Sequence, residues 1–246
     1  MTAAVAYAIA CVFAAAIVRG FAGFGFSLLA ITAISLAMPT AMAVPAIFLM
    51  EIAASLHLLP GVWREVHWRA IGLLLLGCLV TTPLGVWLLA TVPAPPMQVA
   101  LGLVVLTAAG LLLRGYALQT MPGRTATVAT GAASGLLNGA FGIGGPPVIL
   151  FFFASPAGVA VGRASVIAYF LGTDLIGLAF MLPEGLIGTT QLWLALAFLP
   201  ALVAGNWIGA RGFRGVGHEA FRRWVLWLLM LLALLTLGQG LSGFTH

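Results

Sequence analysis

Charge is what this 246-residue chain has least of, because only 6% of its residues are Asp, Glu, Lys or Arg. A soluble domain carries about 25% charged residues, so this chain has too few to cover a water-facing surface. The composition therefore excludes a soluble globular enzyme. With 63% hydrophobic residues it also excludes a disordered chain. The apolar residues extend along the whole sequence, which excludes a protein with a single membrane anchor.

Alternating segments of the kind that build a transmembrane β-barrel are also missing. Runs such as residues 71–79 and 225–235 are apolar on every face, as helices in lipid are. The mean hydropathy of the chain is +1.18. The sequence therefore predicts an all-α polytopic membrane protein.

Lysine is absent, and all ten basic residues are Arg, giving a net charge of +5. The Arg residues are spread between apolar runs without a recognition motif, so we expect no nucleic-acid partner and a role in topology. The two cysteines, Cys11 and Cys78, lie inside apolar runs. We interpret them as packing residues and expect no disulfide, metal site or cofactor. The first apolar run lacks a preceding basic segment, so we expect it not to be a cleaved signal peptide.

Six apolar runs are close to the length of about 20 residues that crosses a bilayer. They are residues 44–60, 68–90, 97–113, 163–182, 192–210 and 221–241. Two longer runs, residues 3–38 and 125–154, are interrupted by glycine, and we expect each to form two shorter helices that meet at a break. Non-helical backbone at membrane depth must be covered by protein or by a wet cavity. Both breaks should therefore face the protein interior.

The two breaks occupy matching places in the sequence. The segment Arg19-Gly-Phe-Ala-Gly-Phe-Gly25 aligns with Asn138-Gly-Ala-Phe-Gly-Ile-Gly144 at an offset of 119 residues. Glu51 then falls opposite Asp174 at an offset of 123, and Gly85 opposite Gly209 at 124. This pattern predicts one integral membrane domain made of an N-terminal repeat, residues 1–123, and a C-terminal repeat, residues 124–246. Repeats with broken helices at corresponding positions are typical of transporters, whose substrate site lies between the breaks.

The Arg distribution distinguishes two topologies. If each broken segment is a hairpin, each half adds three further crossings and the halves are inverted, with eight spans by hydropathy and up to ten helical segments. All nine loop arginines then face one side: Arg64, Arg69, Arg114, Arg124, Arg163, Arg211, Arg214, Arg222 and Arg223. If each broken segment crosses once, the first four lie opposite the other five. The positive-inside rule favours the hairpins, with cytoplasmic Arg-rich loops and both termini periplasmic, and the second topology stays open.

The glycine motifs resemble those of the TauE/SafE family of anion exporters, the sulfite exporter or TSUP superfamily. The matching segments are Arg19-Gly-Phe-Ala-Gly-Phe-Gly-Phe-Ser27 and Gly135-Leu-Leu-Asn-Gly-Ala-Phe-Gly-Ile-Gly-Gly-Pro-Pro147. The size, hydropathy and duplication are also similar over the whole chain. The resemblance implies a carrier of the bacterial inner membrane for sulfite, organosulfonates or related small anions.

Arg19 is the one arginine far from a predicted loop, since it lies at the first break. Burying an unpaired guanidinium in the bilayer costs about 2.5–3.5 kcal/mol on insertion scales, so something must offset the cost. A planar guanidinium can donate two hydrogen bonds to an oxyanion, which makes Arg19 a candidate substrate ligand. The alternative is an internal ion pair with Glu51 or Asp174.

Glycine lets the backbone leave helical angles and approach a ligand without a Cβ in the way. Pro146 and Pro147 suit the first turn of a new helix, and Phe26 and Ser27 would begin the corresponding helix of the first half. Two helix N-termini meeting at the midplane would form an anion site. The alternative is close helix packing through small residues. The candidate substrate-binding glycines are Gly23, Gly25, Gly142, Gly144 and Gly145.

Asn138 holds the position that corresponds to Arg19. Its amide could donate to an anion oxygen or satisfy backbone groups freed at the break. Ser27 is a further candidate binding residue with the same two interpretations, and the structural one is favoured for Ser27 and Ser134.

Glu51 and Asp174 are the carboxylates that lie inside apolar runs. A carboxylate at membrane depth near an arginine can exchange a proton for an anion. We therefore consider both as proton-coupling groups, against the alternative of a permanent salt bridge.

Other functional classes find less support. A serine, aspartyl or metalloprotease of the membrane needs paired catalytic groups that this sequence lacks, and no Walker motif is present. An intramembrane enzyme is therefore a remote alternative. An uncoupled anion channel would use the same chemistry at the breaks, so it stays open beside the expected secondary transporter with alternating access.

Overall fold

The computed structural model describes residues 2–22, 25–114, 120–153, 155–212 and 218–243. These residues form α-helices and one short 3-10 helix, with no strand among them. The all-α class predicted from the composition is therefore confirmed.

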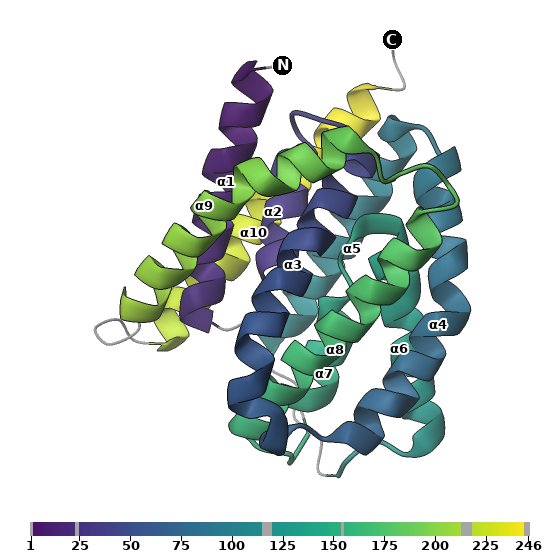
Figure 1. Cartoon of the computed structure of the whole chain (residues 1–246), viewed down its shortest axis with the longest axis vertical. Helices are drawn as coiled ribbons and strands as arrows, with labels where there is room; N and C mark the ends of the chain where they lie inside the picture. The colour runs from purple at the N-terminus through teal and green to yellow at the C-terminus, as the bar shows by residue number, and fades with distance from the viewer. Residues whose placement is uncertain (1, 23–24, 115–119, 154, 213–217, 244–246) are drawn as a thin grey trace. The chain divides into compact units, whose positions relative to one another are not determined.

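The described helices are drawn in Figure 1. Their bounds are α1 Thr2–Ala22, α2 Phe26–Ile34, α3 Thr40–Val62, η1 Trp63–Glu65, α4 Trp68–Thr91, α5 Ala94–Arg114, α6 Arg124–Phe141, α7 Gly145–Phe153, α8 Val159–Met181, α9 Thr189–Gly212 and α10 His218–Ser242.

Within the described ranges, six helices are long and apolar enough to span a membrane: α1, α3, α4, α5, α8 and α9. In α10 the apolar part is the shorter segment Leu226–Ser242. The two interrupted runs do form pairs of helices. The partners are unequal, since α1 and α6 have 21 and 18 residues whereas α2 and α7 have nine each. The glycines therefore follow a nearly complete crossing and do not divide the run in the middle.

The chain forms two compact units. Unit 1 comprises Met1–Ile47, Val92–Arg114 and Gly188–His246, and unit 2 comprises Phe48–Thr91 and Gly115–Ile187. Each unit contains helices from both predicted repeats: α1 and α9 belong to unit 1, and α4 and α6 belong to unit 2. The division into repeats 1–123 and 124–246 stays a prediction from the sequence.

In unit 2, α4 and α6 pack closely through glycine. A Cβ added at Gly85 would lie 2.5 Å from the Leu136 carbonyl oxygen, and one at Gly139 would lie 2.6 Å from the Thr82 carbonyl oxygen. Thr81 Oγ1 donates a hydrogen bond of 2.6 Å to the Ala132 carbonyl oxygen. Small residues allow the two backbones to approach this closely, which is how helices associate in lipid.

Unit 1 contains the corresponding contact with the two halves exchanged. A Cβ at Gly209 of α9 would clash with the Ile17 carbonyl oxygen of α1, and the Gly20 Cα would lie 3.0 Å away. Gly209 corresponds to Gly85 at the offset of 124, and Ile17 and Gly20 correspond to Leu136 and Gly139 at the offset of 119. Leu136 and Gly139 are also the residues that a Cβ at Gly85 would contact. Likewise a Cβ at Gly205 would lie 2.6 Å from the Phe13 carbonyl oxygen. The corresponding residues of unit 2 are Thr81 and Ala132, which are joined by the hydrogen bond described above. The same helix crossing thus occurs once in each unit, which supports the predicted duplication.

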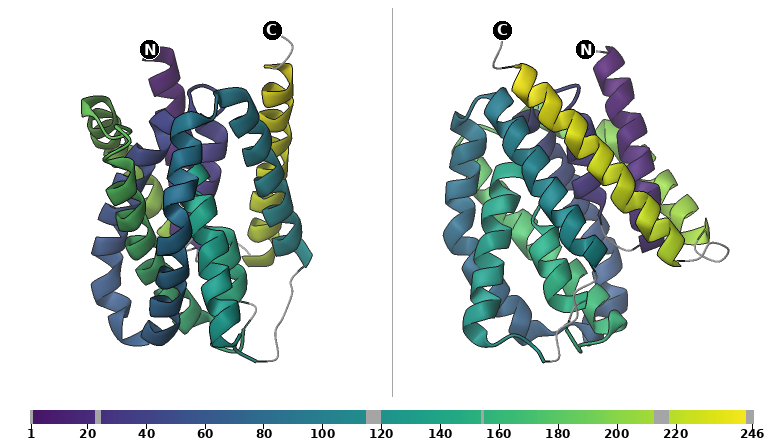
Figure 2. Two further views of the ribbon diagram at one scale, coloured as in Figure 1. Left: turned by 90° about the vertical axis from the view of Figure 1, so that its right-hand side faces the viewer. Right: turned by 180° about the vertical axis from the view of Figure 1, so that it is seen from behind.

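The equivalent helices α5 and α10 pack against each other in unit 1, as the right-hand view of Figure 2 shows. A Cβ at Gly102 would lie 2.8 Å from the Ala233 carbonyl oxygen, and one at Gly240 would lie 2.9 Å from the Pro95 carbonyl oxygen. Contacts thus move backward along α10 as they move forward along α5, so the pair is antiparallel. Inverted repeats require this orientation of equivalent helices, so the packing supports the inverted topology.

In α4 the exposed face is apolar and the face that packs on α6 is small or polar. In α4, the contact face carries Gly77, Cys78, Thr82 and Gly85, all of which are buried. The opposite face exposes large apolar side chains: Leu76, Leu79, Val80, Leu84 and Trp87. This arrangement reverses that of a soluble helix and fits a helix whose outer face contacts lipid.

Helices α4, α6 and α8 all begin at one end of unit 2. The contacts of α4 and α6 advance together along both sequences, so these helices are parallel. The His67 amide before α4 donates a 2.9 Å hydrogen bond to Ser165 Oγ in the first turns of α8. The chain therefore turns back at the break between α6 and α7, as the hairpin interpretation predicts. Four arginines share this end of unit 2: Arg64, Arg69, Arg124 and Arg163.

The glycine crossing generates a stability prediction. Gly85→Ala places a methyl group against the backbone of α6, and we expect a loss of about 1–3 kcal/mol from overpacking. Gly72→Ala is the matched control, because it lies in the same helix with no heavy atom within 4 Å of the added Cβ. We expect Gly72→Ala to be neutral or stabilising, since alanine favours a helix over glycine. Thermal unfolding in detergent measures both, and equal melting temperatures would contradict the close crossing.

Candidate functional site

The second break is a buried glycine turn. Helix α6 ends at Phe141, and Gly142 follows with φ 67°, a left-handed conformation that glycine adopts without strain. The Gly142 amide donates a 2.7 Å hydrogen bond to the Asn138 carbonyl oxygen. Helix α7 then begins at Gly145, with Pro146 and Pro147 in its first turn as predicted. The residues from Phe141 to Pro146 are all buried, so the break faces protein.

Asn138 holds the turn together with its side chain. Its Oδ1 accepts a 3.1 Å hydrogen bond from the Gly144 amide. Its Nδ2 donates to Thr173 Oγ1 at 3.2 Å and to Asp174 Oδ1 at 3.3 Å, both on α8. Ser134 Oγ donates to the Gly144 carbonyl oxygen. Asn138 and Ser134 thus satisfy backbone groups freed at the break, the structural role that the sequence analysis considered for both.

The first break lies in unit 1, and the structure describes it from Gly25 onward. Gly25 has φ 89°, and α2 begins at Phe26, as predicted. The Leu29 amide donates a 3.1 Å hydrogen bond to the Gly25 carbonyl oxygen. Ser27 in the first turn is 7% exposed, and the rest of α2 is buried as well. Gly23 lies outside the described residues.

Arg19 is buried in the last turn of α1, with 5% of its surface exposed. Its guanidinium carbon lies 5.9 Å from the centroid of the Phe26 ring, a distance at which a cation and an aromatic face attract. The interior position predicted for this arginine is confirmed. Arg19 and α2 belong to unit 1 whereas Asn138 and α7 belong to unit 2, so convergence of the two breaks stays a prediction.

The two candidate coupling groups are also buried. Glu51 on α3 is 2% exposed, and Asp174 on α8 is fully buried. Asp174 accepts the hydrogen bond from Asn138 Nδ2 and so lies beside the second break. Their interior placement is as predicted, and their role in coupling stays a prediction.

A chain of hydroxyl and thiol groups extends from the second break, and the sequence analysis missed it. Thr173 Oγ1 lies 3.0 Å from Cys78 Sγ, which lies 3.3 Å from Thr82 Oγ1. Tyr169 lies one turn before Thr173 and is fully buried. The sequence spacing could have indicated this cluster. Cys78 and Thr82 are four residues apart within an apolar helix, as are Tyr169 and Thr173, so each pair shares a helix face.

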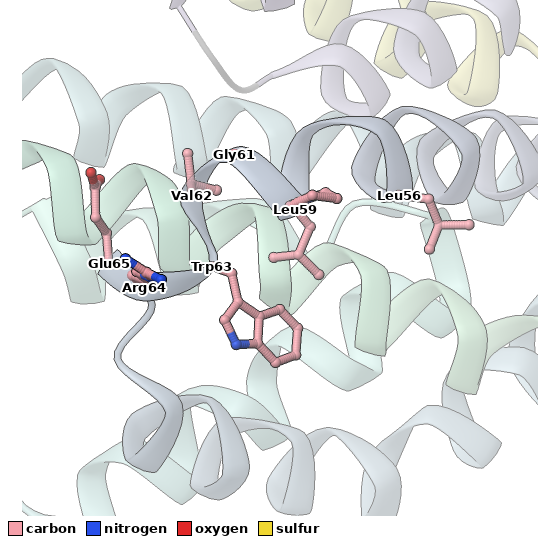
Figure 3. Close-up of a pocket in the computed structure, with 8 residues that line it drawn as sticks. Leu56, Leu59, Gly61, Val62, Trp63, Arg64 and Glu65 are labelled. Atoms are coloured by element: carbon pink, nitrogen blue, oxygen red, sulfur yellow. The ribbon is translucent and has the colours of Figure 1, made fainter.

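The pocket in Figure 3 lies away from these residues, at the end of α3 and on η1. Leu56 and Leu59 line it together with the exposed Trp63, Arg64 and Glu65. The Trp63 and Trp68 rings are 4.2 Å apart between centroids. This end of unit 2 has the composition of an interfacial anchor, with aromatic and basic side chains together.

Long apolar helices, a buried glycine turn between α6 and α7, and charged groups held in the interior are features of helical membrane transporters. The sequence pattern of the family described as "Sulfite exporter TauE/SafE" matches residues 8–236, and the chain belongs to this family. Its cargo is accordingly a small anion that crosses a lipid bilayer.

Two relatives are similar over most of their length. The "Probable sulfite/organosulfonate exporter TauE" of Cupriavidus necator is 28% identical over 198 residues, covering 79% of this chain and 77% of the relative. The "Probable inner membrane transporter protein TsaS" of Comamonas testosteroni is 30% identical over 206 residues, covering 81% and 82% respectively. No solved structure matches this chain.

The bonds of Asn138 generate a second stability prediction. Asn138→Ala leaves the buried Gly144 amide without its acceptor, so we expect a loss of about 1–3 kcal/mol. Gln239→Ala is the control, because that exposed amide donates to the Leu36 carbonyl oxygen and its loss should change stability by less than about 0.5 kcal/mol. Hydrogen exchange of a peptide covering the second break should accelerate in Asn138→Ala alone. Unchanged exchange would contradict the assigned role of Asn138.

Proposed function

We propose that this chain is a secondary transporter that exports small anions such as sulfite or organosulfonates from the bacterial cytoplasm by alternating access. The family and the names of the two relatives support this substrate class. The observation that carries the proposal is the burial of Arg19 at a glycine-broken helix.

Arg19 supplies the permanent positive charge of the proposed site. Its guanidinium stays protonated in proteins and presents paired N–H donors that match the oxygens of a sulfite or sulfonate group. An anion bound there offsets the cost of keeping the guanidinium away from water. An ion pair with Glu51 or Asp174 in the empty transporter is compatible with this role, because substrate and carboxylate can alternate as its partner.

The two broken helices supply the positive ends of their dipoles, at the first turns of α2 and α7. Short broken helices in transporters bind anionic groups in this way. In α7 the dipole is the main contribution, because Pro146 and Pro147 carry no N–H. The proposed binding residues are therefore Arg19, Gly23, Gly25, Ser27, Asn138, Gly142, Gly144 and Gly145. The amides of Gly142 and Gly144 are bound by Asn138, so in this proposal these two glycines shape the turn that brings the end of α7 to the ligand.

Alternating access requires two bundles that can rock against each other. The crossings α1 with α9 and α4 with α6 are equivalent under the duplication, and each lies within one compact unit. We infer that the two units move as the alternating bundles. The arginines that share one end of unit 2 support a cytoplasmic location for that end, and the chain is proposed to reside in the inner membrane with both termini periplasmic.

Glu51 and Asp174 are the proposed coupling groups. A carboxylate that is protonated on one side of the membrane and deprotonated on the other ties anion movement to the proton gradient. Asp174 Oδ1 accepts a hydrogen bond from Asn138 on α6, and Cys78 on α4 and Tyr169 on α8 lie beside the adjacent Thr173. Burial of Asp174 beside the second break supports its participation.

The substrate site is tested by ligand stabilisation of the purified protein. Sulfite, sulfate, thiosulfate, taurine, sulfoacetate and carboxylates are screened for a concentration-dependent rise in melting temperature. At about 100 times Kd a ligand adds about 2.7 kcal/mol. We expect the sulfur anions to stabilise the wild type and Arg19→Ala to abolish the response, because the site loses its charge.

Arg69→Ala is the matched control, since it removes an exposed arginine from the start of α4 and should keep the response. Arg19→Lys retains the charge without the planar pair of donors, and we expect a weakened response. A wild type that no anion stabilises, or an Arg19→Ala variant with the wild-type response, would overturn the site. Exchange of labelled anion across liposomes with saturable flux identifies a carrier, whereas ohmic current above carrier rates would identify a channel.

Proton coupling is tested by neutralising both carboxylates. Glu51→Gln with Asp174→Asn removes the titrating groups without changing side-chain size, so we expect anion flux in proteoliposomes to lose its dependence on a pH gradient. Glu184→Gln, at an exposed carboxylate after α8, is the control and should keep it. A double variant with undiminished pH dependence would exclude these two residues as coupling groups.

A further inference from the structure

Tyr169 is a fully buried side chain with a polar end that the fold leaves unused. Its exposed surface is 0%. Its hydroxyl lies beside Ser134, Cys78 and Thr173. Among the described residues, none makes a hydrogen bond of normal geometry with Tyr169 Oη.

An unsatisfied hydroxyl is costly in this position. Buried polar groups in proteins almost always have a hydrogen-bond partner, and one without a partner costs about 1–3 kcal/mol. Phenylalanine would fill the same space without that cost, so packing alone does not account for a tyrosine here. The repeat-equivalent position at an offset of 123 is Ala46, so the predicted duplication does not require an aromatic residue at this place either.

The neighbours of Tyr169 are already occupied with one another. Thr173 Oγ1 lies 3.0 Å from Cys78 Sγ and 3.2 Å from Asn138 Nδ2. Ser134 Oγ donates to the Gly144 carbonyl oxygen of the second break. Tyr169 Oη therefore remains available to a ligand, and its neighbour Ser134 bonds the glycine turn.

We propose that Tyr169 is a substrate-binding residue whose hydroxyl donates a hydrogen bond to an oxygen of the transported sulfur oxyanion or sulfonate. This inference rests on the proposed function, since it names a further residue of the same site. The chemistry is suitable because a phenol is a neutral donor that needs no counter-charge when the site is empty. A hydrogen bond to a charged acceptor is stronger than one to a neutral group, so Tyr169 Oη gains its best partner when the anion arrives.

Tyr169→Phe tests the inference, since it removes only the hydroxyl. The probes are methanesulfonate and sulfite, with chloride as the reference salt, and the readout is the Kd obtained from the rise in melting temperature with anion concentration. We expect this Kd to increase about 10- to 100-fold, the loss that follows from removing one hydrogen bond to a charged group. The melting temperature without anion should stay the same or rise, because an unsatisfied polar group is gone.

Tyr7→Phe is the matched control. The Tyr7 hydroxyl on α1 donates a 3.1 Å hydrogen bond to the Ala33 carbonyl oxygen, so its removal should lower the melting temperature slightly and leave anion affinity unchanged. In proteoliposomes, Tyr169→Phe should raise KM for the anion more than it lowers the maximal flux.

The outcomes separate this inference from the proposed function. A Tyr169→Phe protein with wild-type anion affinity would overturn the inference and leave the transporter intact, and a lower melting temperature without anion would then show that the hydroxyl binds protein or a water molecule only. A wild type that responds to neither probe, and transports neither, would overturn the proposed function and this inference with it. Weaker affinity in Tyr169→Phe supports the inference whatever the baseline stability, because the Kd is obtained from the rise above each variant's own melting temperature without anion.

Discussion

The structure depends on how a broken helix finds hydrogen-bond partners for its backbone N–H and C=O groups away from water. Hydrocarbon offers no hydrogen bonds, so the groups freed between α6 and α7 need partners from the protein. Asn138 and Ser134 bind the Gly144 amide and carbonyl, and the surrounding residues exclude lipid. Once this is done, a helix N-terminus can stand inside the protein with its donors facing a cavity or a ligand. The buried polar side chains of α8 follow from the same constraint, because they contact the residues that hold the break.

Under the predicted duplication, unit 1 meets the same constraint with different chemistry. The crossing of α1 with α9 repeats that of α4 with α6, yet the position of Asn138 is taken by Arg19. One half therefore presents a neutral amide that supports the turn, and the other presents a charge. Tyr169 and Thr173 likewise correspond to Ala46 and Met50. The halves share the glycines that pack their helices and differ in their buried polar groups. This is expected if the glycines determine the fold and the polar groups determine which anion is bound.

The class, the helices and the breaks could be predicted because each has a local signal. Long apolar runs predict spans, the glycine cluster before Pro146 and Pro147 predicted the start of α7, and the matching cluster of the first half predicted the start of α2. Burial of Arg19, Glu51 and Asp174 followed from their positions inside those runs. The lengths on either side of each break were less predictable, since periodicity does not locate a turn within an apolar segment. The hydroxyl and thiol cluster of Tyr169, Cys78 and Thr173 was missed because two of its helices are 95 residues apart in sequence at the Cys78 and Thr173 contact, and only the fold brings them together.

The exchange of helices between halves has a consequence for biosynthesis. Helix α4 is followed within a few dozen residues by its partner α6, whereas α1 ends at Ala22 and its partner α9 begins at Thr189. At about 5–20 residues per second, the ribosome takes roughly 10–30 s to supply α9. During that interval the close-packing face of α1, which includes Ile17 and Gly20 on either side of Arg19, has to be covered by the insertion machinery or by lipid. All of unit 2 is synthesised before α9 and α10, the last two helices of unit 1. The order of the helices in the sequence therefore allows unit 2 to fold before unit 1.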